Sequence, residues 1–192
     1  MGSKADFRVV ALDADDTLWH NDGLFVTTHA EFRALLTNYH DPEWIDQRLY
    51  ETEKRNLSHY GYGVKSFTLS MIETAVELTE GRITGAEIQK LIDLGREMLQ
   101  APVELLEGVE DVVRALSGCY FLMLLTKGDL FDQESKLARS GLGEHFSAVE
   151  IVSEKDARTY TRVMDRHGVR LEQFLMVGDS LRSDVLPVLE VC

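Results

Sequence analysis

The chain has 192 residues, of which 44% are hydrophobic, and its formal net charge at pH 7 is -13. This length and composition predict an ordered globular protein, either one large domain or one domain that carries an insertion, and exclude intrinsic disorder. Because no Lys/Arg cluster offsets the acidic charge, we expect neither nucleic acid nor an anionic membrane surface as a partner.

The N-terminal residues and the cysteines bear on the cellular compartment. No apolar run is long enough to span a membrane, and Met1–Lys4 contains no hydrophobic signal core. Asp6 breaks the myristoylation pattern. Cys119 and Cys192 lie far apart without CxxC spacing, so neither a disulfide framework nor a thiolate metal site is predicted. We therefore expect a reducing, cytoplasmic location.

The first element in chain order is Val9–Leu12, an apolar run with the length and β-branched content of a buried strand. Three carboxylates follow it at once, those of Asp13, Asp15 and Asp16. A strand without polar alternation is typical of a parallel sheet, and ligands of open α/β sheets bind at the carboxyl ends of the strands. Carboxylates held close together repel, so a cation or a shared proton is needed there. The alternative is an Asp-rich turn that caps a helix.

The part of the chain from residue 21 to residue 105 is predicted to be almost entirely helical. Asn21–Gly23 has turn-forming residues and predicts a turn that acts as a hinge. A proline in a first turn starts one helix, and a capping box of Thr84 and Glu87 starts another. The helices are predicted over Thr27–Tyr39, Pro42–Leu57, Phe67–Leu78 and from Thr84 to Leu99.

Two details of this helical part can be stated from the pattern. The loop His59–Gly63 combines glycines with the tyrosines Tyr60 and Tyr62. The helix after it offers four apolar side chains for burial, those of Leu69, Ile72, Val76 and Leu78.

From Leu106 onward, predicted helices alternate with predicted strands, which is the pattern of a parallel α/β sheet. The expected helices are Gly108–Leu116, Leu130–Arg139 and Asp156–His167, and the expected strands are Tyr120–Leu125, Val149–Val152 and Phe174–Val177. Polar residues follow every strand, so four polar strand ends are expected to meet at one crevice.

The residues at these strand ends suit the transfer of a phosphoryl group, which needs a nucleophile, a hydroxyl, backbone N–H groups and cations. They resemble the four motifs of the haloacid dehalogenase (HAD) superfamily, in the same order and each after an apolar strand. The matching residues are Asp13-Ala14-Asp15-Asp16-Thr17, then Thr126, then Lys155, then Gly178-Asp179-Ser180 with Asp184.

The resemblance implies an α/β fold, with a Rossmann-like HAD core of parallel strands and an inserted all-helical cap of the first cap class (C1). The core would comprise residues 1–20 and 106–192, and the cap would comprise residues 21–105. The sequence stops at Cys192, within the helix expected after the fourth motif, whereas family members usually continue with at least one more strand. We therefore expect either that the core is truncated at its C-terminus or that its sheet is shorter than usual.

The resemblance also implies the chemistry of the site. Asp13 would attack phosphorus and become an aspartyl phosphate, and Asp15 would protonate the leaving alkoxide and later deprotonate water. Mg²⁺ would be held by the Asp13 carboxylate, the Asp15 backbone carbonyl and Asp179. Asp184 would orient metal-bound water or Lys155.

Phosphate is expected to be bound by the Thr126 hydroxyl, the Lys127 backbone N–H and the Lys155 ammonium. Each assignment has an alternative: Thr126 could cap the following helix, and Lys155 could be a solvated surface lysine. Asp179 and Asp184 could be a helix cap and a first-turn acid.

Substrate contacts beyond the phosphate are expected from Trp19 and His20, which follow the first motif. Tyr60 and Tyr62, with Lys65 nearby, are further candidates, although aromatic residues of a helical insert are more often core residues. No role is assigned to Asp16, and the histidines lack metal-ligand spacing.

The sequence therefore predicts a cytoplasmic, magnesium-dependent phosphatase that acts on a small phosphorylated metabolite. The presence of Asp15 as a proton donor argues against a dehalogenase, because a departing halide needs no proton. Two alternatives remain open: a phosphomutase of the same family, and a catalytically silent binding or regulatory protein with the HAD fold. The substrate and the oligomeric state are not predicted.

Overall fold

The computed structural model describes residues 7–191, so the expectations for Met1–Lys4, Asp6 and Cys192 lie outside the described residues. Contacts between Cα atoms divide the chain into two compact units. We call residues 1–20 and 103–192 the α/β unit and residues 21–102 the helical unit; the boundary expected from the sequence was residue 105. Within residues 7–191 no helix is both long and apolar enough to cross a membrane.

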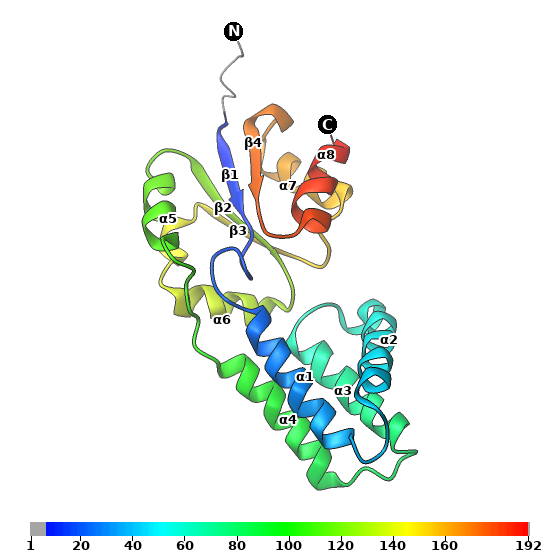
Figure 1. Cartoon of the computed structure of the whole chain (residues 1–192). Coiled ribbons are helices and arrows are strands. Elements are labelled where there is room, and N and C mark those ends of the chain that lie inside the picture. Colours follow the sequence, from blue (N-terminus) through cyan, green and yellow to red (C-terminus); the bar gives the residue numbers. More distant parts are fainter. Residues whose placement is uncertain (1–6, 192) are drawn as a thin grey trace. The chain divides into compact units, whose positions relative to one another are not determined.

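The α/β unit is built on a four-stranded sheet in the order β3-β2-β1-β4 (Figure 1). All neighbouring strands are parallel, which confirms the predicted sheet. The strands are β1 (Val9–Leu12), β2 (Phe121–Lys127), β3 (Ala148–Val152) and β4 (Phe174–Val177). Since every strand runs the same way, their carboxyl ends lie along one edge of the sheet. Strand β2 continues past the predicted Leu125 and includes Thr126 and Lys127.

Helices cover both faces of this sheet, as the alternation of side chains along β1 shows. Val10 and Leu12 pack with residues of the helices α5 (Val109–Ser117) and α6 (Leu130–Ser140). Val9 and Ala11 pack on the opposite face with α7 (Ala157–His167) and α8 (Leu186–Val191). Both faces of β1 are therefore buried, which explains its unbroken apolar sequence. The remaining helical turns are Gly143–His145, Leu171–Gln173 and the π-helical Leu181–Val185.

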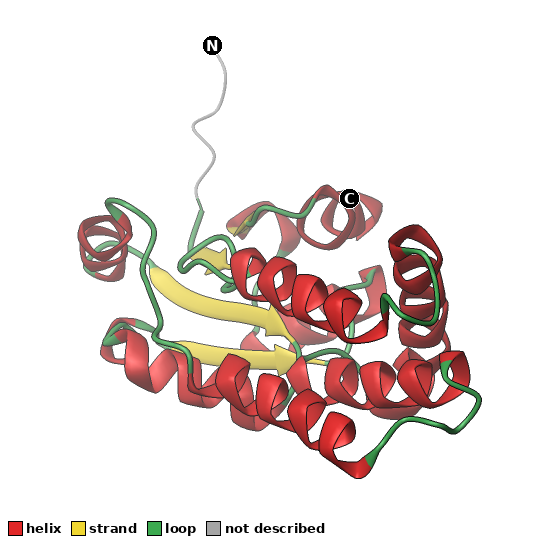
Figure 2. Cartoon of the chain, turned by 60° about the horizontal axis from the view of Figure 1, so that its bottom comes forward, coloured by secondary structure: helices red, strands yellow, loops and turns green. Residues whose placement is uncertain are grey.

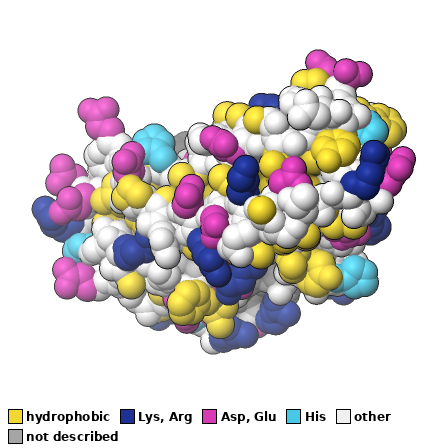
Figure 3. Space-filling view, turned by 90° about the horizontal axis from the view of Figure 1, so that it is seen from below, with side chains coloured by type: hydrophobic (Ala, Val, Ile, Leu, Met, Phe, Trp, Pro, Cys, Tyr) yellow, Lys and Arg dark blue, Asp and Glu magenta, His cyan; other side chains and the backbone are white. Residues whose placement is uncertain are grey.

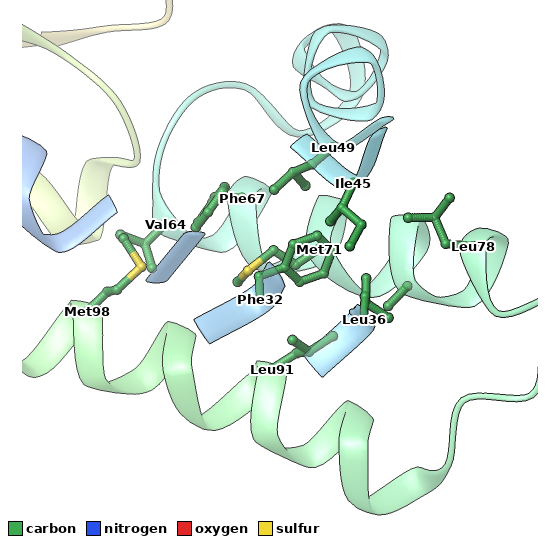
Figure 4. Close-up of a cluster of buried hydrophobic side chains, with 11 residues drawn as sticks. Phe32, Leu36, Ile45, Leu49, Val64, Phe67, Met71, Leu78, Leu91 and Met98 are labelled. Atoms are coloured by element: carbon green, nitrogen blue, oxygen red, sulfur yellow. The ribbon is translucent and has the colours of Figure 1, made fainter. Parts of the chain in front are cut away.

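The helical unit consists of four helices around one hydrophobic core. They are α1 (Asp22–Leu36), α2 (Pro42–Tyr60), α3 (Val64–Leu78) and α4 (Gly85–Gln100), and Figure 2 shows them in red. In Figure 4, Ile45 of α2, Met71 of α3 and Leu91 of α4 lie around Phe32 and Leu36 of α1. The predicted capping box of Thr84 and Glu87 is confirmed, because each side chain accepts a hydrogen bond from the other's backbone N–H.

Three local predictions in this unit were wrong. The turn expected at Asn21–Gly23 is replaced by the start of α1 at Asp22, whereas a hinge at this segment stays a prediction. Tyr60 ends helix α2 instead of lying in the loop. In α3, Leu69 and Val76 were expected to be buried but are 45% and 40% exposed. The helix begins at Val64, three residues earlier than predicted, and its buried residues recur every three or four positions from there. The buried face carries Val64, Phe67, Met71, Ala75 and Leu78.

The surface seen in Figure 3 is mixed in charge. Acidic and basic side chains are interspersed there with hydrophobic ones, and neither sign forms a continuous patch on this face.

Candidate active site

Asp13 lies directly after β1, at the edge of the sheet where the strands end. Its backbone N–H donates to the Val177 carbonyl at 2.9 Å, which continues the pairing of β1 with β4 by one residue. The residue is buried, with 8% of its surface exposed. Oδ1 accepts a hydrogen bond from Lys155 Nζ at 2.5 Å, so an acid after the first strand and a lysine after the third lie in contact, as the motif order predicts.

Lys155 is 3% exposed, and its ammonium also donates to Asp184 Oδ1 at 2.6 Å. The alternative of a solvated surface lysine is therefore wrong. Burial of a lysine is costly unless it is paired, and here it is paired with two carboxylates from two different segments.

Asp179 and Asp184 follow β4 and complete a group of three carboxylates with Asp13. Oxygen atoms of the three side chains all lie within 4.8 Å of one another. The Asp184 side chain is fixed by a second bond, because Oδ2 accepts from the Ser180 N–H at 3.1 Å. The Asp179 N–H donates to Thr17 Oγ1 at 3.1 Å, which ties the fourth motif to the first.

Gly178 is needed for this arrangement. A Cβ atom at position 178 would lie 2.3 Å from the carboxyl carbon of Asp184, a distance that real Cβ contacts do not reach. Only glycine leaves room for the Asp184 carboxylate to lie against the backbone at the end of β4.

The three carboxylates form a donor set that suits a hard divalent cation. Burial raises the pKa of Asp13 to about 6, although Lys155 opposes this shift and the nearby Asp184 adds to it. The single ammonium of Lys155 offsets only part of the negative charge of three carboxylates. Carboxylate oxygens are the ligands that Mg²⁺ prefers, so the residues present fit a magnesium ion.

Asp15, two residues after Asp13, is held by three hydrogen-bond donors. Oδ1 accepts from Trp19 Nε1 at 2.7 Å and from Lys136 Nζ at 3.0 Å, while Oδ2 accepts from Gln133 Nε2 at 2.8 Å. The sequence reasoning missed Gln133 and Lys136. Both lie on α6, and their contacts with Asp15 fix the carboxylate in one orientation.

Helix α6 buries a polar face, which explains why these residues were missed. Asp132, Gln133 and Lys136 are buried, whereas Phe131 on the same helix is 70% exposed. Lys136 Nζ also lies 3.6 Å from Asp132 Oδ2. Hydrophobic periodicity, read alone, indicates the wrong face of this helix. The available signal was a glutamine and a lysine three residues apart on the helix that follows the second motif.

Gly128 allows α6 to start close to the sheet. Its φ is +147°, and a Cβ there would lie 3.2 Å from Gln133 Nε2. Asp129 caps the helix by accepting from the Asp132 N–H at 3.0 Å. The alternative that Thr126 caps this helix is therefore wrong.

Thr126 and Lys127 lie at the end of β2. Thr126 is buried, and its hydroxyl makes no hydrogen bond with another residue of the described part of the chain. Lys127 Nζ donates to Ser183 Oγ at 3.2 Å and lies 3.5 Å from Glu154 Oε1. The ammonium of Lys127 thus ties β2 to the segment after β4, and phosphate binding by its backbone N–H stays a prediction.

The four residues expected to contact a substrate differ in their exposure to solvent. Trp19 is 1% exposed and holds Asp15, so it belongs to the core and offers no surface to a substrate. His20 is exposed. In the helical unit, Tyr60 is exposed and Tyr62 lines a cavity. Asp16 adopts a left-handed backbone conformation with φ of 57°, which aspartate tolerates better than most residues, so its part is to shape the turn.

The geometry agrees with what comparisons with known proteins found. A family model described as haloacid dehalogenase-like hydrolase matches residues 7–188. A haloacid dehalogenase-like family hydrolase from Xanthomonas campestris is 48% identical, with a TM-score of 0.92 over 97% of this chain and 78% of that chain. A search of curated proteins found no match.

Two more distant crystal structures share the fold. The HAD-hydrolase YfnB from Bacillus subtilis, bound to magnesium, is 18% identical, with a TM-score of 0.67 over 96% of this chain and 85% of that one. A 2-haloacid dehalogenase from Pseudomonas syringae is also 18% identical, with a TM-score of 0.65 over 96% of this chain and 83% of that one.

Proposed function

The chain belongs to the haloacid dehalogenase-like hydrolase family, and on that basis we propose that it is a magnesium-dependent phosphatase that hydrolyses a small phosphorylated metabolite. The observation that carries the proposal is the contact of Lys155 with both Asp13 and Asp184, beside an independently held second acid, Asp15.

Asp13 acts as the nucleophile. One of its carboxylate oxygens forms a bond to phosphorus while the bond from phosphorus to the ester oxygen breaks, which leaves an aspartyl phosphate and an alkoxide. Lys155, 2.5 Å from Oδ1, orients the carboxylate and offsets the negative charge that meets there. Thr126 supplies a hydroxyl donor at the end of the neighbouring strand.

Asp15 moves the protons. It gives a proton to the departing alkoxide and then takes one from the water that attacks phosphorus, after which the bond to Asp13 breaks and inorganic phosphate leaves. The donors Trp19, Gln133 and Lys136 keep its carboxyl group in place through both steps.

Asp13 and Asp179 offer carboxylate oxygens that would hold Mg²⁺, with the Asp15 backbone carbonyl as a further expected ligand and Asp184 beside them. When bound, the ion supplies positive charge that reduces the repulsion between the phosphate and the nucleophile. Phosphate contact by the Lys127 N–H and orientation by Asp184 complete the proposed site.

A dehalogenase is the rival that shares this fold. Release of halide from carbon requires no proton donor for the leaving group, whereas release of an alkoxide does. An acid held by three side chains two residues after the nucleophile therefore favours the phosphate ester. We also propose a cytoplasmic location for the protein, because its exposed Cys119 carries a free thiol, which fits a reducing compartment.

The test is Mg²⁺-dependent hydrolysis of p-nitrophenyl phosphate by the wild type, by Asp13→Asn and by Glu134→Gln, which removes an exposed carboxylate of α6. We expect Asp13→Asn to abolish hydrolysis and Glu134→Gln to leave it unchanged. Equal rates for wild type and Asp13→Asn would refute the nucleophile, and chloride release from a haloacid without phosphatase activity would favour the rival. A panel of phosphorylated sugars, nucleotides and organic acids then identifies the substrate. If the reaction requires a sugar bisphosphate, the enzyme is a phosphomutase instead.

A further inference from the structure

The helical unit contains a cavity of about 250 Å³. Its lining contains one acid, Glu53, and four aromatic rings, those of Phe25, Tyr50, Tyr62 and Phe67. All of them belong to the helical unit, whereas the residues of the carboxylate site belong to the α/β unit.

Glu53 is the unusual residue of this cavity. It is partly buried, and it makes no hydrogen bond or ion pair with any residue from 7 to 191. Burial raises the pKa of its carboxyl group to about 7. A carboxylate withdrawn from water without a partner is costly, so a ligand that supplied a positive charge there would gain the interaction that the chain itself does not provide.

Other acids of the same helix show the contrast. Asp46 pairs with Arg33 at 2.8 Å, and Glu51 pairs with Arg48 at 2.5 Å. Helix α2 therefore pairs its other two partly buried carboxylates and leaves Glu53, which lines the cavity, without a partner.

The aromatic lining favours the same sign of charge. Phe25 and Phe67 lie with their ring centroids 5.1 Å apart. The ring of Tyr50 already attracts a cation, because Lys54 Nζ lies 5.0 Å from its centroid. Aromatic faces carry partial negative charge, so they attract ammonium groups and repel anions.

Lys54 limits where a ligand can be held. It lines the cavity as well, but it is exposed and lies over Tyr50. A second cation is repelled on that side, which leaves Glu53 and the pair Phe25 and Phe67 as the favourable surface.

The cavity also has a defined wall formed by the loop that follows α2. Gly61 and Gly63 have φ values of +68° and +113°, a backbone conformation that side chains rarely allow. The Gly61 N–H donates to the Leu57 carbonyl at 3.0 Å. Tyr62 is therefore presented to the cavity between two fixed turns.

We propose that this cavity binds a small organic ammonium compound, whose nitrogen pairs with the Glu53 carboxylate and whose alkyl groups contact the aromatic rings. The same combination of a carboxylate and aromatic faces suits both alkylated and primary ammonium groups. The proposal stands independently of the phosphatase reaction, since none of its residues belongs to the carboxylate site.

Calorimetric titration of the full chain at saturating Mg²⁺ tests it, with choline as the probe and neohexanol as the neutral molecule of nearly the same shape. We expect choline to bind at least about tenfold more tightly than neohexanol, since a charged partner typically contributes that much. Glu53→Gln should weaken choline by about tenfold or more. Glu97→Gln, which removes an exposed carboxylate of α4, should leave choline binding unchanged.

A second variant, Phe25→Leu, removes one ring of the favourable surface and keeps Glu53, so it guards against a folding defect in Glu53→Gln. It should also weaken choline, and thermal unfolding of each variant shows that it is folded. Absence of choline binding to the wild type, or equal binding to wild type and Glu53→Gln, would overturn the proposal. Equal binding of choline and neohexanol would overturn it as well, because a purely apolar cavity does not distinguish them.

Discussion

Lys136 Nζ lies 3.0 Å from Asp15 Oδ1, although 121 residues separate the two in the sequence. Lys136 is buried, and Gln133 on the same helix donates to the other oxygen of Asp15. Helix α6 thus fixes the orientation of Asp15, the proposed proton-transfer group. Lys136 is therefore a positioning residue for the reaction.

Lys136→Met should lower kcat by about a hundredfold, because it releases Asp15 and proton transfer typically contributes at least that factor. Steady-state kinetics with p-nitrophenyl phosphate measures the effect. If Lys136 acts through Asp15, Lys136→Met should cost little more in an Asp15→Asn background. Two fully additive losses would contradict that coupling.

The free energy of unfolding of Lys136→Met shows whether Lys136 acts on catalysis or only on folding. Lys136→Met leaves the buried Asp132 without its cation, which lies 3.6 Å away, and should cost about 3 kcal/mol in the free energy of unfolding. Adding Asp132→Asn should restore much of that stability, as urea unfolding would show, but not kcat. Recovery of kcat together with stability would mean that Lys136 has a structural part alone.

Gly178→Ala should destabilise the α/β unit by about 1–3 kcal/mol, because the new methyl group would displace Asp184 from its contact with Lys155. Gly23→Ala in α1 is the matched control, since nothing lies within 4 Å of its Cβ position, and it should be neutral or stabilising by up to about 1 kcal/mol. Urea unfolding compares the two. A Gly178→Ala protein as stable and active as the wild type would disprove the close packing.

Mg²⁺ should raise the temperature of thermal unfolding relative to EDTA, whether or not a substrate is present. At a concentration a hundredfold above the dissociation constant, the ion would stabilise the folded chain by about 2.7 kcal/mol. Asp179→Asn should reduce this effect strongly, whereas Asp165→Asn, at an exposed position of α7, should not. Identical shifts in both variants would place the ion elsewhere.

Glu53→Gln should make stability less dependent on pH. The folded-state pKa of Glu53 is about 7, above its ordinary value of 4.5, so the folded chain binds more protons than the unfolded chain between these values. The contribution of this group to stability is therefore present at low pH and is lost as the pH rises through about 7. Allowing for its partial exposure, the advantage of Glu53→Gln over wild type should grow by roughly 1 kcal/mol between about pH 5 and about pH 8.

Urea unfolding at the two pH values measures this difference, with Glu97→Gln as the control. Among the residues that line the cavity, Lys54 is the other charged one. A constant difference between wild type and Glu53→Gln would show that the carboxyl group titrates normally.

Much of the local structure could be predicted because its causes are local. The unbroken apolar run Val9–Leu12 required a strand covered on both faces, and the pair Thr84 and Glu87 required a helix start. The order of the parallel strands' polar ends also predicted that Asp13 and Lys155 would meet, since parallel strands share one edge for their carboxyl ends.

The tertiary structure alone decided which side of each helix is buried and which polar groups pair. It turned Leu69 and Val76 toward solvent, placed Trp19 in the core, and brought Gln133 and Lys136 to Asp15. Sequence spacing determines which residues share a helical face, but the neighbouring elements determine what that face meets. A face that meets a carboxylate is stabilised by donors rather than by apolar groups, because a buried charge must be paired.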